Sequence, residues 1–278
     1  MLFLLLAIFS SSMISIVMRL SSDRICANLS MLATNYLVCS LLGAAYAGFD
    51  LVVPEVTGFS VTLWLGLLSG VLYLAGLVMF QTNTRRRGVV LSSVFMKLGL
   101  LVPMVMSVLV FKEMPTASQV AGFCIAVVAI VLINWKKGGA GGGFGLDLIV
   151  MLLLSGGADA MAKIFDVFGP GSLSALYLFY TFATAFGLCV VLVVRKKERP
   201  GFRELLYGTL VGVPNFFSAK FLLGALTRLP AVVVYPSFSV ATMLIVTLTG
   251  VAVFREKLSG RQWIALGGII AALILLNI

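Results

Sequence analysis

The sequence has no histidine among its 278 residues, and it has only four cysteines. Without histidine, the chain lacks the usual base of a serine nucleophile, a common metal ligand and a histidine proton relay. The cysteines lack the C-x-x-C spacing of metal or redox sites and lie at positions 26, 39, 124 and 189. We therefore expect no enzyme activity, no bound metal and no cofactor.

Charged residues are also scarce. They make up 11% of the chain, against about 25% in typical globular domains, whereas hydrophobic residues make up 61%. The formal net charge of +10 comes from basic residues that lie mainly in short loops between apolar runs. Retention of those loops in the cytoplasm explains them without a nucleic-acid partner. The composition predicts an all-α polytopic membrane protein in the lipid bilayer.

The apolar runs have the length that a helix needs to cross about 30 Å of hydrocarbon. We expect ten such helices, at residues 2–19, 30–48, 60–80, 88–110, 117–135, 146–165, 172–194, 204–224, 231–253 and 261–277. The glycine-rich stretch KKGGAGGGFG follows the fifth run but lacks the G-K-[ST] ending of a phosphate-binding loop. It is interpreted as a flexible linker.

A short motif with two charged residues occurs twice, as VFKE at 110–113 and as VFRE at 253–256. Other residues match at the same offset of 143 positions, and a G-x-x-x-G pair recurs at nearly that offset. A polar set spread over so many residues indicates that one half of the chain copies the other. The matches pair Arg85 with Arg228, Gln119 with Gln262, Asn134 with Asn277, Gly66 with Gly208 and Gly70 with Gly212.

Each half then holds five predicted helices, and an odd number forces the second half to enter the membrane upside down. The predicted organisation is a first five-helix repeat at 1–137, a linker at 138–145 and an inverted second repeat at 146–278. Loop charge agrees with the inversion, because odd-numbered loops hold 15 Arg or Lys and even-numbered loops hold two. The positive-inside rule places the odd loops in the cytoplasm and both chain ends outside the cell membrane.

These features resemble the EamA-type transporters of the drug/metabolite transporter superfamily over essentially the whole chain. The resemblance rests on the two five-helix halves, on the F-[KR]-E turn before the fifth and tenth helices, and on Arg19 and Lys163 near the ends of the first and sixth. It implies a central cavity lined by both halves and transport of small metabolites by alternating access. Family members often have both ends in the cytoplasm, in contrast to the loop charge here. The smaller four-helix multidrug members use a glutamate in their first helix, which this chain lacks.

Ionisable residues within the spans are the first candidates for a solute site, because they are costly in lipid. Lys97 either contacts the solute or pairs with an acid on another helix. Asp159 and Lys163 either neutralise each other on one helix face or take part in transport. Lys220 and Arg19 lie near span ends, where snorkelling to the interface is an alternative. Uncharged candidates that could orient a solute or join helices are Asn35, Tyr36, Ser93, Tyr177, Tyr180, Asn215, Tyr235 and Ser237.

Basic candidates outnumber acidic ones, which favours a solute with a carboxylate or phosphate. The predicted function is a secondary transporter of a small metabolite. The alternatives are an intramembrane enzyme and a non-transporting receptor or structural membrane protein. A monomer is compatible with this architecture, and the sequence leaves the oligomeric state, the coupling ion and the direction of transport open.

Overall fold

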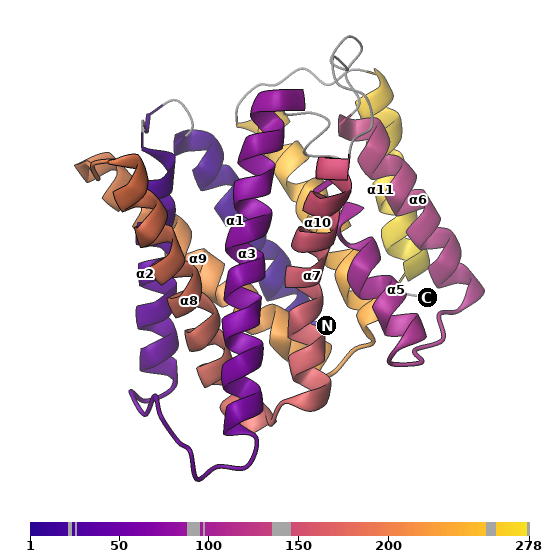
Figure 1. The fold of residues 1–278 in the computed structure, drawn as a ribbon. Helices are drawn as coiled ribbons and strands as arrows, with labels where there is room; N and C mark the ends of the chain where they lie inside the picture. The colour runs from indigo at the N-terminus through magenta and orange to yellow at the C-terminus, as the bar shows by residue number, and fades with distance from the viewer. Residues whose placement is uncertain are drawn as a thin grey trace. The chain divides into compact units, whose positions relative to one another are not determined.

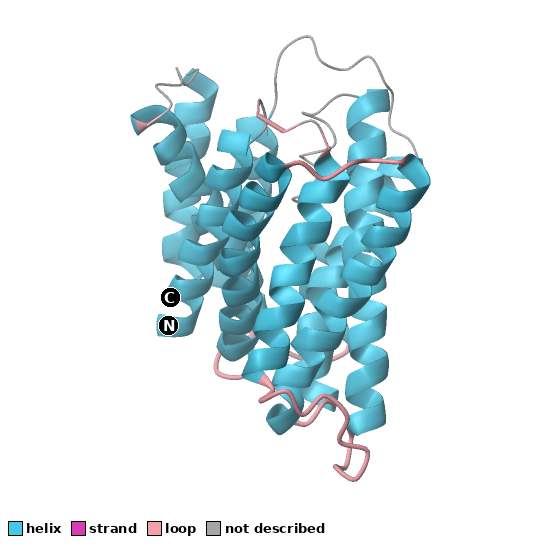
Figure 2. Cartoon of the chain, turned by 90° about the vertical axis from the view of Figure 1, so that its left-hand side faces the viewer, coloured by secondary structure: helices cyan, strands magenta, loops and turns pink. Residues whose placement is uncertain are grey.

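The computed structural model describes residues 1–21, 24–25, 27–87, 95–96, 98–134, 146–253 and 260–276. Within these residues the regular secondary structure is helical (Figures 1 and 2). A short 3-10 turn at Gly171–Leu173 precedes α8. The α-helices are α1 Leu2–Ser21, α2 Asn28–Tyr46, α3 Phe59–Arg87, α5 Leu101–Leu109, α6 Ala117–Asn134, α7 Leu146–Phe168, α8 Ser174–Lys196, α9 Phe202–Leu226, α10 Ala231–Ala252 and α11 Gly260–Leu276.

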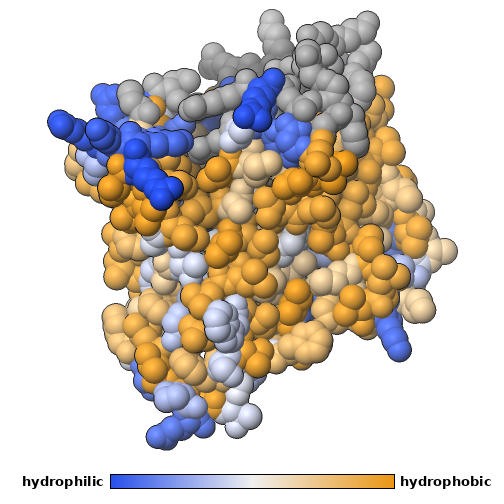
Figure 3. Space-filling view, viewed as in Figure 1, coloured by the Kyte–Doolittle hydropathy of each residue, from blue (hydrophilic) through white to orange (hydrophobic). Residues whose placement is uncertain are grey.

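These helices confirm the predicted ones apart from the run at 88–110, and most ends differ by a few residues. The largest extension is that of α3, which continues to Arg87. Seven helices of the described residues are long and apolar enough to cross a membrane, and two shorter apolar helices lie at Ala117–Leu132 and Trp263–Leu276. Their outward faces carry large apolar side chains such as Trp64, which is 69% exposed. Hydrophobic residues cover most of the middle of the visible helices in Figure 3.

The run at 88–110 differs from a single continuous helix. A turn at Gly99 and Leu100 precedes α5, and the Gly99 amide donates to the Met96 carbonyl at 3.2 Å. The start at Leu101 puts Pro103 in the first helical turn, where its missing N–H has no intrahelical partner to lose. Residues 88–94 and 97 lie outside the described residues, so the first half of this span stays a prediction.

The chain forms two compact units. Unit 1 comprises Met1–Leu74 and Met161–Thr227, and unit 2 comprises Ala75–Ala160 and Arg228–Ile278. Each unit takes segments from both predicted repeats. The repeat boundaries therefore do not coincide with the compact units and stay a prediction.

In unit 1, the G-x-x-x-G pair of α3 packs against α8. A Cβ added at Gly66 would lie 2.7 Å from the Tyr180 Cβ, and one at Gly70 would lie 2.7 Å from the Thr184 Cβ. Separations below 3.0 Å exclude a side chain, so only glycine allows the two backbones to approach this closely. The contacts advance in the same direction along both helices, which therefore run parallel.

The G-x-x-x-G pair of α9 packs against α2 in the same way. A Cβ at Gly208 would lie 2.5 Å from the Thr34 Cβ, and one at Gly212 would lie 2.8 Å from the Val38 Cβ. These two helices also run parallel. Helices α2 and α8 are antiparallel, because Tyr36 stacks on Phe182 at 6.4 Å while the later Cys189 thiol donates to the earlier Leu29 carbonyl at 3.5 Å.

In unit 2, α6 packs antiparallel to α11. A Cβ at Gly122 would lie 2.9 Å from the Leu275 Cβ, and the nearest atom to one at Gly268 is the Ala129 Cβ at 3.6 Å. Apolar residues of α6, α10 and α11 form a buried core around Ile130 and Val240. These contacts join a helix of the first predicted repeat to helices of the second.

The first copy of the repeated motif, VFKE at 110–113, has a structural role. Glu113 accepts a hydrogen bond from the Val232 backbone N–H at 3.3 Å, in the first turn of α10, and another from the Ser107 hydroxyl. A carboxylate at a helix N-terminus satisfies an unpaired donor and opposes the positive end of the helix dipole. Glu113 thus caps α10. Residues 254–256 of the second occurrence lie outside the described residues.

Candidate functional site

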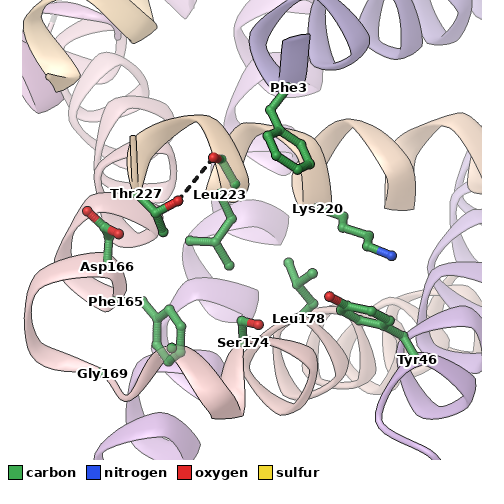
Figure 4. A pocket seen from close by; sticks show the side chains of 12 residues that line it. Phe3, Tyr46, Phe165, Asp166, Gly169, Ser174, Leu178, Lys220, Leu223 and Thr227 are labelled. Carbon is green, nitrogen blue, oxygen red and sulfur yellow. Dashed lines mark hydrogen bonds between the residues drawn. The ribbon is translucent and has the colours of Figure 1, made fainter. Parts of the chain in front are cut away.

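A cavity of about 230 Å³ lies within unit 1 at the end where α1 begins and where α2, α7 and α9 end (Figure 4). It is smaller than the roughly 300–1,000 Å³ of drug-sized ligand sites and suits a small metabolite. Both predicted repeats contribute residues to it. The wall consists of Phe3, Tyr46, Phe165, Asp166, Gly169, Gly171, Ser174, Leu178, Lys220, Leu223, Gly224 and Thr227.

Lys220 brings a positive charge to the cavity wall. It lies on α9 less than two turns before the helix end, and its ammonium sits 3.6 Å from the centroid of the Tyr46 ring (Figure 4). The Phe217 ring is 6.0 Å away. Within the described part of the chain, Lys220 forms no ion pair with a carboxylate. The ring face attracts the ammonium without neutralising its charge.

A second lysine near the cavity is already neutralised. Lys163 and Asp166 lie one turn apart on α7, with 3.3 Å between Nζ and Oδ2, and their side chains are only 9% and 12% exposed. Asp166 lines the cavity on the side away from Lys220 in Figure 4. Asp166 lines the cavity and Lys163 does not, but the positive charge of Lys163 offsets the negative charge of Asp166. The net charge at the described wall is therefore about the single positive charge of Lys220.

The remaining wall is mainly apolar. Leu178 and Leu223 are buried, and Phe165 is 1% exposed because its ring stacks on that of Tyr177 at 4.3 Å with an interplanar angle of 12°. Phe3 on α1 packs against Phe221 on α9 with 6.2 Å between ring centroids. These contacts join α7 to α8 and α1 to α9 around the cavity and fix the apolar part of its wall.

The ends of unit 1 differ in charge. The cavity end carries Asp50 and Glu55 in the loop after α2, whereas the other end carries basic residues at the junction of α8 and α9. At that basic end, Glu204 is 7% exposed and accepts backbone N–H bonds from Gly201 at 3.1 Å and from Ala27 at 3.4 Å. Glu198 accepts from the Ser30 N–H at 3.1 Å. The two carboxylates tie the α8–α9 loop to the start of α2.

Two of the predicted uncharged site residues, Asn35 and Asn215, lie together between α2 and α9. The Asn215 amide on α9 donates to Asn35 Oδ1 on α2 at 3.1 Å, and Asn35 is 2% exposed. Interhelical amide bonds of this kind join membrane helices. The structure therefore gives both residues a packing role beside the Gly212 contact.

The predicted tyrosines of unit 1 are engaged with neighbouring helices and loops. Tyr36 is buried and stacks on Phe182. The Tyr177 hydroxyl donates to Ser69 Oγ at 3.2 Å, and the Tyr180 hydroxyl donates to the Leu51 carbonyl. None of the three lines the cavity of about 230 Å³, whereas Tyr177 lines a smaller cavity of about 20 Å³ that shares Leu178 and Leu223 with it.

Other candidates belong to unit 2 or are not described. The Tyr235 hydroxyl on α10 donates to the Asp159 backbone carbonyl on α7 at 2.7 Å, and Ser237 is 2% exposed. Lys97 and Ser93 lie outside the described residues, so their contact with a solute stays a prediction. The same holds for a role of Asp159 in coupling and for its pairing with Lys163.

The sequence left Lys220 open between snorkelling and ligand binding, and the predicted site residues did not include it. The available signal was the aromatic setting, because Phe217 lies about one turn before Lys220 on α9 and Phe221 follows it directly. Tyr46, which supplies the closest ring, belongs to α2 and is far away in sequence. Asp166, the acid that pairs with Lys163, was also missed, although it shares a helix face with Lys163 at i,i+3.

The whole chain is similar to known proteins. An uncharacterized protein of Haemophilus influenzae (strain Rd) is 22% identical over 277 residues, which cover 95% of this chain and 93% of that protein. A crystal structure of a protein with 16% sequence identity matches 99% of this chain and 94% of its own with a TM-score of 0.72. That similarity shows a shared fold. No family model matches the chain.

Proposed function

We propose that the protein is a secondary transporter that moves a small metabolite, carrying a carboxylate or phosphate, across the cell membrane by alternating access. In this proposal, ten spans form two inverted five-helix repeats, as in EamA-type transporters, with both chain ends outside. The observation that carries the proposal is the pair of matched glycine contacts in unit 1.

The two contacts agree residue by residue. Gly66 faces Tyr180 and the Tyr177 carbonyl, whereas Gly208 faces Thr34 and the Met31 carbonyl. The α8 residues lie 146 positions after their α2 counterparts, and the same offset relates the contacts of Gly70 to those of Gly212. A duplicated sequence that folds twice into the same helix contact accounts for this agreement.

The helix directions support inversion of the second copy. An axis in the membrane plane that exchanges the repeats would exchange α2 with α8 and α6 with α11, and it requires each of these pairs to be antiparallel. Their contacts have that direction. The same axis would convert the parallel α3–α8 contact into the parallel α9–α2 contact. Tyr36 and Phe182 would then meet at the axis itself, because they are also 146 positions apart.

Inverted repeats of this kind are the architecture of many secondary transporters, which bind solute between the repeats and rock around it. The cavity supports this function, since residues of both repeats line it and one wall carries a cation.

Counterflow in proteoliposomes tests the proposed function. A thermal-shift screen of the purified protein against small metabolites first selects solutes that bind. Vesicles loaded with an unlabelled binder and diluted into the labelled compound should accumulate the label transiently and saturably, because alternating access exchanges one bound solute for another. Protein-free vesicles and a metabolite that gives no thermal shift serve as controls. A solute that binds but never exchanges across the membrane would contradict the transporter proposal.

A further inference from the structure

We propose that the cavity of unit 1 binds a monocarboxylate with an apolar body, and that Lys220 binds its carboxylate. The proposal rests on the proposed function only for the claim that this compound is then transported. The binding site itself is built from residues of α1, α2, α7, α8 and α9.

The charge of the wall selects a monoanion. Lys220 is the one basic residue among the described residues that line the cavity, and the Asp166 carboxylate on the same wall is bound to Lys163. A cationic solute would meet the Lys220 charge at close range. A phosphate dianion would bring a second negative charge near Asp166 with no second cation to bind it. One carboxylate matches one lysine.

The Tyr46 ring also holds the Lys220 side chain in a position from which it can bind a carboxylate. The Tyr46 ring lies on one side of the ammonium at 3.6 Å. An ammonium has three donor hydrogens, and a ring face occupies at most one side of it, so donors stay directed away from Tyr46. Because the ring restricts the flexible side chain, less conformational entropy is lost when an anion binds.

The apolar wall selects the body of the ligand. Phe3, Phe165, Leu178 and Leu223 offer rings and branched chains, whereas the hydroxyl groups of the described wall are those of Tyr46, Ser174 and Thr227. The Thr227 hydroxyl already donates to the Gly224 carbonyl at 3.0 Å. A polyhydroxylated solute would therefore leave many of its hydroxyl groups without partners, whereas a ring or short alkyl chain buries its surface favourably.

A zwitterion is a weaker match. Its ammonium would have to compete with Lys163 for Asp166, which lines the side of the cavity away from Lys220 (Figure 4). The comparison between 3-phenylpropanoate and phenylalanine isolates this point, because the two differ only in the ammonium group. The expected order is tighter binding of 3-phenylpropanoate.

The test measures equilibrium binding of a charge series to the purified full-length protein by calorimetry and thermal shift. Benzoate, hexanoate and 3-phenylpropanoate should bind, whereas benzamide, benzylamine and phenyl phosphate should bind at least about tenfold more weakly. Lys220→Met should weaken binding of the carboxylates by about ten- to hundredfold, and Lys220→Arg should retain most of it. Tyr46→Leu should weaken it by about two- to tenfold, and Tyr46→Phe by less, because phenylalanine keeps the ring.

Lys112→Met is the matched control, since it removes the same charge from an exposed lysine outside the cavity. Its binding should equal that of the parent protein. The charge series on the parent protein decides the proposal even if Lys220→Met does not fold. Equal binding of benzoate and benzamide, tighter binding of phenylalanine than of 3-phenylpropanoate, no carboxylate binding below about 10 mM, or unchanged affinity in a folded Lys220→Met protein would each overturn it.

Failure of this proposal and failure of the transporter proposal give different results. If carboxylates bind through Lys220 but show no counterflow, the site assignment holds and transport is wrong. If another class of solute shows counterflow that Lys220→Met leaves unchanged, transport holds and the site assignment is wrong.

Discussion

Replacing Asp166 by asparagine is expected to lower the free energy of unfolding by about 3–5 kcal/mol, one of the two largest effects that we expect of a single substitution. The change removes the carboxylate from Lys163, whose side chain is 9% exposed. Taking one partner out of a buried ion pair removes much of the compensation for the charge that stays buried, which is strongly destabilising. The measurement is the shift of the unfolding transition in detergent, followed by fluorescence-detected size exclusion after heating.

Two further variants separate the ion pair from a general effect of the change. The double substitution Lys163→Met with Asp166→Asn removes both charges and should recover most of the lost stability, because replacement of a whole buried pair is often neutral. Asp50→Asn makes the same chemical change at an exposed loop residue and should stay within about 0.5 kcal/mol of the parent. A single variant as stable as the parent would show that Asp166 does not hold the Lys163 charge.

The second large effect is expected at the glycine contacts. Gly70→Ala and Gly212→Ala should each lower the free energy of unfolding by about 1–3 kcal/mol, because the new methyl group would collide with backbone and Cβ atoms of the facing helix. The nearest Cβ atoms are those of Thr184 and Val38, at 2.7 and 2.8 Å. Neither contact ends on a flexible side-chain tip that could move aside.

Gly187→Ala is the matched control for both variants. A Cβ at this α8 position meets nothing within 4 Å, so alanine should be neutral or slightly stabilising through its higher helix propensity. If the two contacts are copies of one another, Gly70→Ala and Gly212→Ala should cost similar amounts. A loss at one site and none at the other would argue against equivalent contacts.

The positions of most helices could be predicted from the sequence because the length of an apolar run follows from the thickness of the bilayer. The interruption before α5 could not, since Gly99 and Pro103 are both tolerated inside membrane helices and the hydropathy of the run stays high. The pairing of Lys163 shows a related limit. Both Asp159 and Asp166 share its helix face, so the spacing along the helix does not single out Asp166, whose ion pair with Lys163 the structure shows.

The solute site was harder to predict than the fold. Polarity within spans selected Asn35, Asn215 and Tyr177, and the structure places all three in hydrogen bonds between helices. Intramembrane polar groups serve helix packing and ligand binding alike, so polarity alone does not distinguish the two. The environment of Lys220 depends on the approach of α2 to α9, which no local pattern in either helix specifies.

Inversion of the second repeat is the central claim, and cysteine labelling of two equivalent loops tests it most directly. In a background without the four native cysteines, Glu55→Cys lies in the loop after α2 and Lys197→Cys lies in the loop after α8. A membrane-impermeant maleimide applied to intact cells should label Glu55→Cys at once and label Lys197→Cys only after permeabilisation, because loop charge places them on opposite sides. Labelling of both positions from the same side of the membrane would contradict the inverted repeat.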